Sequence, residues 1–301
     1  DLYITNLHGC SPITIHDSLI SNTSNIETIS ALSNNLVFGE NHTITGFTLP
    51  ISIENSVLLG GENNTINPLS QIALRGAIIG GKDNSISGRS ENAFIAGSVN
   101  STIQGAYLGP GGAVIGSSNS SIVNSRGTAI VGGSGNSIAS GAQYSIVIGG
   151  IGNVMGINAS KSIILGGEIN NISGSTEYSG IFAGSGNTID THSNSVIIGG
   201  DNNLIHAPLP ARQSEGILGG SFNTISGNSS YSTIIGGNLN LISGAFNSSI
   251  IGSTECSISG VSGGHLSVII ASTQSWVDNT ISNANNSTHI STQRASIKEN
   301  S

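Results

Sequence analysis

The sequence predicts an all-β protein, a parallel β-solenoid of about fourteen coils that are 16–20 residues long. Three observations support this fold class. A phrase of two apolar residues, two glycines and an asparagine recurs along most of the chain. The repeat is too short for a helical hairpin but fits two short strands and two turns. Aromatic residues are only 4% of the chain and charged residues 8%, so the core must be thin and built from stacked β-branched side chains.

The recurring phrase has clear copies at residues 58–66, 197–205 and 234–242. The first small residue of each copy, always Gly or Ala, serves here as a marker for comparing coils. The short coil has 16 or 17 residues, and longer coils carry extra loop residues. The fourteen markers are Gly39, Gly60, Gly80, Ala96, Gly116, Gly132, Gly149, Gly166, Ala183, Gly199, Gly219, Gly236, Gly252 and Ala271.

The two residues before each marker are apolar in every copy. Adjacent residues of a strand face opposite sides, so one should enter the core and the other should face outward as an apolar row. Such a row is unusual on a monomer and favours packing against other copies of the chain, for example around a three-fold axis. The alternative is a turn that rotates both residues inward. The predicted core and interface residues are Ile79, Ile148, Leu165, Ile198, Leu218, Ile235 and Ile251.

The marker and the residue after it predict a tight corner. The following residue is Gly in ten of the fourteen copies, which indicates positive φ or a close approach of two backbones. A phosphate-binding loop is a weaker interpretation, because no helix pattern follows these glycines.

Four residues after the marker, an asparagine recurs in ten copies. Asparagine tolerates turn conformations, and its amide can bond to the backbone and to the asparagine one coil away, so we expect an internal asparagine ladder. A ligand-binding row is the alternative. The ladder residues are Asn64, Asn84, Asn100, Asn136, Asn153, Asn170, Asn187, Asn203, Asn223 and Asn240.

The repeat divides the chain into three regions. Residues 1–35 lack it but contain alternating segments, so we expect capping or connecting strands there. Residues 36–278 form the solenoid, and residues 279–301 read as a polar tail or linker. Trp276 is the only tryptophan and lies in the last coil, where we expect it to cap the open core end. A role in stacking on carbohydrate is the alternative.

No catalytic, cofactor or metal site is expected. Cys10 and Cys256 are far apart, and Cys256 replaces an asparagine of the ladder, so a buried thiol is expected there. The histidines lack metal-ligand spacing. A weak Ca²⁺ site at the loop acids is an alternative, although the calcium-binding nonapeptide is missing. The net charge of −8 with eight Lys and Arg disfavours nucleic acid, and no apolar run is long enough for membrane insertion. The loop acids are Glu62, Asp83, Glu168 and Asp201.

The phrase Ser-Val-Ile-Ile-Gly-Gly-x-x-Asn-x-Ile at residues 195–205 resembles the head repeats of trimeric autotransporter adhesins of the YadA-like type. It also resembles repeats of phage and giant-virus tail fibres. The resemblance covers residues 36–278, with Gly-Gly and Asn where adhesin heads more often have Ala-rich turns. It implies a side-by-side homotrimer used for attachment at a virion or cell surface.

The sequence therefore predicts a non-catalytic fibre or adhesin segment, extracellular, with a cell-surface receptor or glycan as a further partner. An ice-binding solenoid is one alternative. It would need a flat threonine array, whereas the outward residue after the asparagine varies among Thr65, Val154, Asn171 and Leu204. The other alternative is a carbohydrate-active right-handed β-helix enzyme. The sequence shows no cluster of carboxylates or arginines that would form its catalytic groove.

Overall fold

The structure of the chain is a computed structural model. It describes residues 19–21, 32–33, 36–44, 53–54, 56–67, 75–88, 90–105, 111–206, 214–252, 254–260, 266–271, 280–282, 287–291 and 296–298. These residues contain β-strands and turns and no helix. The chain divides into two compact units, residues 1–149 and residues 150–301, and each is described by itself.

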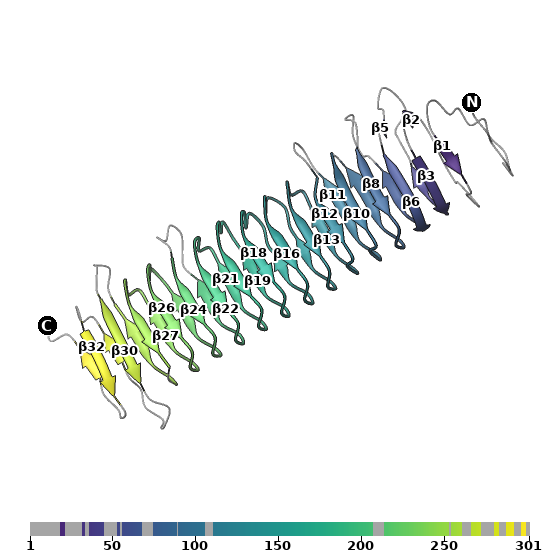
Figure 1. Cartoon of the computed structure of the whole chain (residues 1–301). Helices are drawn as coiled ribbons and strands as arrows, with labels where there is room; N and C mark the ends of the chain where they lie inside the picture. Colours follow the sequence, from purple (N-terminus) through teal and green to yellow (C-terminus); the bar gives the residue numbers. More distant parts are fainter. Residues whose placement is uncertain are drawn as a thin grey trace. The chain divides into compact units, whose positions relative to one another are not determined.

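The coils of the first unit contribute strands to two parallel sheets, which we call the first and the second sheet (Figure 1). A separate short pair joins β2(Leu32–Ser33) to β5(Ile53–Glu54). The first sheet contains β1(Leu19–Ser21), β3(Leu36–Glu40), β6(Val57–Glu62), β8(Gly76–Ile79), β10(Ala93–Ala96), β12(Ala113–Ile115), β14(Ala129–Val131) and β16(Ile146–Ile148). The second sheet contains β4(Thr43–Ile44), β7(Thr65–Asn67), β9(Ser85–Gly88), β11(Thr102–Gly105), β13(Ser121–Val123) and β15(Ser137–Ile138).

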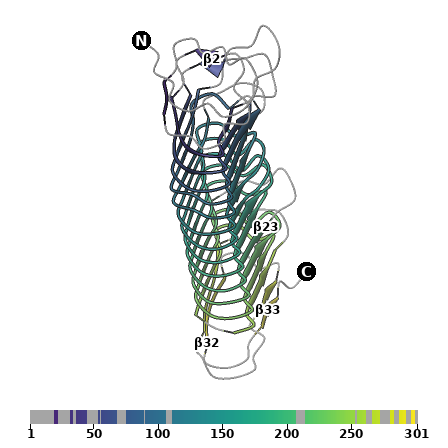
Figure 2. The same ribbon diagram turned by 90° about the vertical axis from the view of Figure 1, so that its right-hand side faces the viewer.

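The second unit repeats this arrangement, with the strands of successive coils side by side (Figure 2). Its first sheet contains β18(Ile163–Leu165), β20(Gly180–Phe182), β22(Val196–Ile198), β24(Gly216–Leu218), β26(Thr233–Ile235), β28(Ser249–Ile251), β30(Ser267–Ala271) and β32(Ser287–Ser291). Its second sheet contains β17(Val154–Met155), β19(Asn171–Ser173), β21(Thr188–Asp190), β23(Leu204–His206), β25(Thr224–Ser226), β27(Leu241–Ser243), β29(Ser257–Ser259), β31(Thr280–Ser282) and β33(Ser296–Lys298).

The predicted parallel β-solenoid is confirmed. The described residues build about 11 turns, fewer than the fourteen copies of the repeat counted in the sequence. Within each unit the register places one aliphatic core residue on another from coil to coil, most often isoleucine on isoleucine. In the second unit, Ile197 pairs with Ile217 and Ile205 with Ile225. These side chains are fully buried. Stacked β-branched residues therefore form the core.

Strand pairing extends into the predicted end regions. In the first region, β1 pairs in parallel with β3. In residues 279–301, β31 pairs with β29, β32 with β30, and β33 with β31. The segment expected to be a polar tail thus contains strands in register with the solenoid. The triplets Thr280–Ser282 and Ser296–Lys298 have the same central isoleucine as Ser257–Ser259, which accounts for the continuation.

Candidate functional site

An outward apolar row lies on the first sheet, at the residue just before the marker. These side chains are 36–48% exposed, whereas the residue before each of them is fully buried, as at Ile78 and Ile197. The two apolar residues therefore face opposite sides of the sheet, as strand alternation requires. Leu165 lies in the same row and is half-buried. The exposed members are Ile79, Ile115 and Ile148 in the first unit, and Phe182, Ile198, Leu218, Ile235, Ile251 and Ile270 in the second.

The outward face of the second sheet differs in chemistry. Its strands present mainly Ser, Thr and Asn beside an occasional apolar residue such as Leu204 or Leu241. Asp190 on β21 accepts a hydrogen bond from Ser173 at 3.0 Å and pairs with His206 at 3.1 Å. Within each unit the solenoid thus has one outward sheet face with an apolar row and one that is largely polar.

The asparagines four residues after the marker form a buried ladder inside each unit, with serines at some of its positions in the first unit. Asn187 shows the pattern: its backbone N–H donates to Asn170 Oδ1 at 3.0 Å, its Nδ2 donates to the Gly200 carbonyl at 3.0 Å, and its Oδ1 accepts from Asn203 N–H at 3.0 Å. Nine of the ten predicted ladder asparagines are buried to 1% exposure or less. The amides satisfy backbone groups at a buried corner where water does not reach.

The prediction for Asn100 was wrong. Asn100 is exposed, and its Nδ2 donates to Asn119 Oδ1 at 2.8 Å. Ser101 occupies the ladder position, fully buried, and its backbone N–H donates to Asn84 Oδ1 at 3.1 Å. The reason is a shift of one residue: Ala96 pairs with Ile79 and so belongs to the outward row, which makes Gly97 the corner residue.

Two other residue types also occupy ladder positions. His42 precedes Asn64 in the ladder: its Nε2 bonds to the Phe38 carbonyl at 3.1 Å, and its Nδ1 lies 3.3 Å from Asn64 N–H. Burial lowers the pKa of His42, against the opposing effect of backbone hydrogen bonds at Phe38 and Gly60. Cys256 is buried as expected, and its N–H donates to Asn240 Oδ1 at 3.0 Å. Cys10 lies outside the described residues.

A second polar ladder was not predicted from the sequence. Four residues before the marker, a buried Ser or Thr recurs in most coils. In several coils its hydroxyl accepts a hydrogen bond from the backbone N–H of the equivalent residue in the next coil. Ser162 Oγ accepts from Ser179 N–H at 3.2 Å, and Ser179 Oγ accepts from Ser195 N–H at 3.1 Å. Serine is so common in this chain that the recurrence does not stand out in the sequence.

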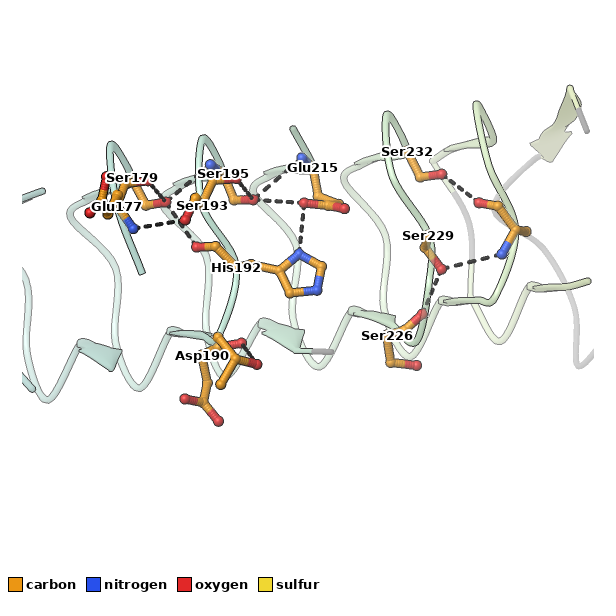
Figure 3. Close-up of polar contacts among 12 residues, drawn as sticks. Glu177, Ser179, Asp190, His192, Ser193, Ser195, Glu215, Ser226, Ser229 and Ser232 are labelled. Atoms are coloured by element: carbon orange, nitrogen blue, oxygen red, sulfur yellow. Dashed lines mark hydrogen bonds and ion pairs between the residues drawn. The ribbon is translucent and has the colours of Figure 1, made fainter. Parts of the chain in front are cut away.

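Glu215 interrupts this serine ladder and contacts His192 (Figure 3). The His192 Nδ1 to Glu215 Oε2 distance is 2.7 Å, and both side chains are fully buried. Ser195 Oγ donates to the same carboxylate oxygen at 2.7 Å. The combination of Ser, His and Glu suggests nucleophilic catalysis, but the geometry does not support it. Both Ser195 and His192 bond to the carboxylate, whereas a nucleophilic serine must bond to the imidazole.

In the second unit, apolar residues with a strained backbone conformation recur at the equivalent turn of three coils. Three residues after the marker, φ is positive in successive coils of this unit, and Gly or Asn stands there at Gly152, Gly186 and Asn202. Ile169, Phe222 and Leu239 adopt this conformation with φ between 53° and 57°, and all three are about half exposed or more. Left-handed backbone costs an L-residue about 1–2 kcal/mol. Folding alone therefore does not explain these large exposed side chains.

Within the described ranges, the remaining candidate residues do not come together as a binding or catalytic site. Glu62 pairs with Lys82 at 3.0 Å, and Asp83 accepts from Asn63 at 3.1 Å. Among the described residues, no group of three or more His, Cys, Asp or Glu could hold a metal ion. The expected end cap Trp276 lies outside the described residues. Within the same ranges, no helix is long and apolar enough to cross a membrane.

The comparisons with known proteins add no functional information to this geometry. No protein-family model matches the chain, and no curated protein matches it.

Proposed function

We propose that this chain is a non-catalytic structural segment of a fibre or adhesin, which self-associates side by side through the first sheet. The observation that carries the proposal is the outward apolar row. In the second unit the row recurs on consecutive first-sheet strands from β20 to β30. Burying it between copies removes apolar surface from water, at about 25 cal/mol per Å².

The contrast between the two sheets indicates which face is buried. The second sheet presents hydroxyl and amide groups that water can solvate, as at Thr188 and Thr224, whereas the first presents Ile198, Leu218 and Ile235. One apolar sheet face in each unit suits a closed cyclic assembly in which all copies are equivalent. The resemblance to trimeric adhesin heads and tail-fibre repeats favours three copies, and with them attachment at a virion or cell surface through a receptor or glycan.

A matched pair of substitutions tests this interface. Ile198 and Leu204 belong to the same coil but lie on opposite sheets. Ile198→Asp should weaken self-association by roughly 100-fold or more, because it places an unpaired charge in a desolvated interface. Leu204→Asp should leave the assembly unchanged. Sedimentation velocity over a concentration series gives the assembly state, and circular dichroism checks that both variants stay folded.

Two results would contradict the proposed interface. One is a folded Ile198→Asp variant with the same assembly state as the unsubstituted chain. The other is a Leu204→Asp variant that dissociates as readily as Ile198→Asp.

A further inference from the structure

The corner that follows the first sheet carries exposed apolar side chains at two places in the second unit. Ile151 and Ile169 lie in one pair of adjacent coils, and Phe222 and Leu239 lie in another, each between 48% and 62% exposed. Ile169 N–H donates to the Ile151 carbonyl at 2.9 Å, and Leu239 N–H donates to the Ser221 carbonyl at 3.0 Å, which places the members of each pair on successive coils. These residues therefore form pairs, unlike the apolar residues scattered singly over an ordinary surface.

Phe222 and Leu239, which we call the corner pair, stand where the backbone suits other residues. Their φ angles are 53° and 57°, in the left-handed region that glycine and asparagine tolerate best. The two preceding coils have Gly186 and Asn202 at the equivalent position, also with positive φ. A bulky apolar side chain there costs conformational energy and exposes hydrocarbon to water. A contact that buries the corner pair would offset both costs.

The corner pair is continuous with the outward apolar row of the first sheet. In the first of its two coils, Leu218 belongs to the row and lies four residues before Phe222. Two glycines follow Leu218, and a Cβ on the first of them, Gly219, would meet no atom within 4 Å. Ser221 comes next, and its hydroxyl donates to Asn238 Oδ1 at 3.0 Å. Two glycines and one serine thus separate the row from the corner pair along the chain.

A closed ring of three copies requires two different contact patches on every chain. The same patch on both partners makes a two-fold contact, whereas a three-fold ring joins one patch of each copy to another patch of the next. The outward apolar row supplies one patch. We propose that the corner pair supplies the other, so that the row of one copy packs against Phe222 and Leu239 of the next. This inference rests on the proposed self-association and names its second surface.

Tyrosines just before the first-sheet strands are the rival second surface. Tyr178 and Tyr231 lie two residues before β20 and β26, with φ of 56° and 62°, and both are more than half exposed. Their hydroxyls can be solvated by water, and Tyr178 accepts a hydrogen bond from Lys161 Nζ at 2.8 Å. Polar groups therefore accompany these rings. The corner pair is purely hydrocarbon and gains more from burial.

Asparagine substitutions in the full chain test the two surfaces. Phe222→Asn with Leu239→Asn removes the corner pair and should weaken self-association by roughly 100-fold or more, as measured by sedimentation velocity over a concentration series. Tyr178→Asn with Tyr231→Asn is the matched control and should leave the assembly unchanged. Asparagine already adopts a left-handed turn at both positions in other coils. Both double variants should therefore stay folded, which circular dichroism checks.

A mixture of two defective variants separates a row-to-corner contact from a row-to-row contact. Ile198→Asp keeps the corner pair, and the corner double variant keeps the row, so the two together can form one intact contact. We expect a one-to-one complex in the mixture, although each variant alone is dissociated. Two rows that pack against each other would leave the corner variant assembled with itself and give no such complex.

The corner pair is not the second surface if its double variant assembles like the unsubstituted chain, if the tyrosine variant dissociates, or if the mixture forms no one-to-one complex. The proposed function survives each of these results as long as Ile198→Asp still dissociates. An unsubstituted chain that is monomeric contradicts both proposals. If a double variant unfolds, Phe222→Asn alone is compared with Tyr231→Asn alone, with the same expected outcomes.

Discussion

Gly200→Ala is expected to destabilise the solenoid by about 4 kcal/mol or more, whereas Gly199→Ala should cost only about 1–2 kcal/mol. Both glycines have positive φ, 67° at Gly199 and 82° at Gly200. Their surroundings differ. A Cβ on Gly199 meets nothing within 4 Å, whereas a Cβ on Gly200 would lie 2.2 Å from the Gly220 carbonyl oxygen and 2.4 Å from Asn203 Nδ2. The second glycine of the corner leaves no room for a Cβ beside the backbone of the next coil.

Thermal and chemical unfolding of the two alanine variants measure this difference. The stability loss of Gly199→Ala measures the cost of a left-handed backbone alone. The loss of Gly200→Ala also includes a clash of the new Cβ with a backbone atom and with the asparagine ladder. Equal losses of stability at the two positions would show that the coils are not stacked as closely as described.

Asn187→Leu is expected to cost about 3 kcal/mol, because it removes a buried acceptor while keeping a side chain of similar size. The Asn203 N–H, which donates to Asn187 Oδ1 at 3.0 Å, would be left unsatisfied, and a buried unpaired donor costs about 1–3 kcal/mol. The leucine also brings an apolar group against the Gly200 carbonyl, where the Asn187 amide now donates. Packing strain therefore adds to the loss of stability.

Asn187→Ser is the matched control. Serine occupies the same ladder position at Ser101 and Ser120, where Ser101 Oγ lies 3.4 Å from Ser120 N–H. We expect the serine variant to lose about 1 kcal/mol, since an acceptor remains near the corner. Denaturant unfolding of both variants gives the two free energies. A leucine variant as stable as the serine variant would mean that the ladder fills space without satisfying the backbone.

The sequence predicted the features that recur at a fixed offset from the marker. The asparagine ladder and the outward row follow from local spacing, because parallel coils place equivalent residues directly above one another. The error at Asn100 arose where Ala96, a small residue, ends the strand and resembles a marker. Only the register between coils shows that Gly97 is the corner residue.

The His192–Glu215 contact was beyond sequence reasoning. The two residues are 23 apart and occupy different positions in their coils, so no repeat offset relates them. The serine ladder was hidden by the abundance of serine. In contrast, the strands at residues 280–282 and 296–298 had a local signal in their central isoleucines, Ile281 and Ile297. That signal was masked by the polar composition of the surrounding segment.

The mass of the full chain in solution, measured by light scattering across a dilution series, tests the proposed function most directly. The apolar row on the first sheet predicts a trimer of a 30.3 kDa chain that persists on dilution. A folded monomer at every concentration, with Ile198, Leu218 and Ile235 left in water, would contradict it.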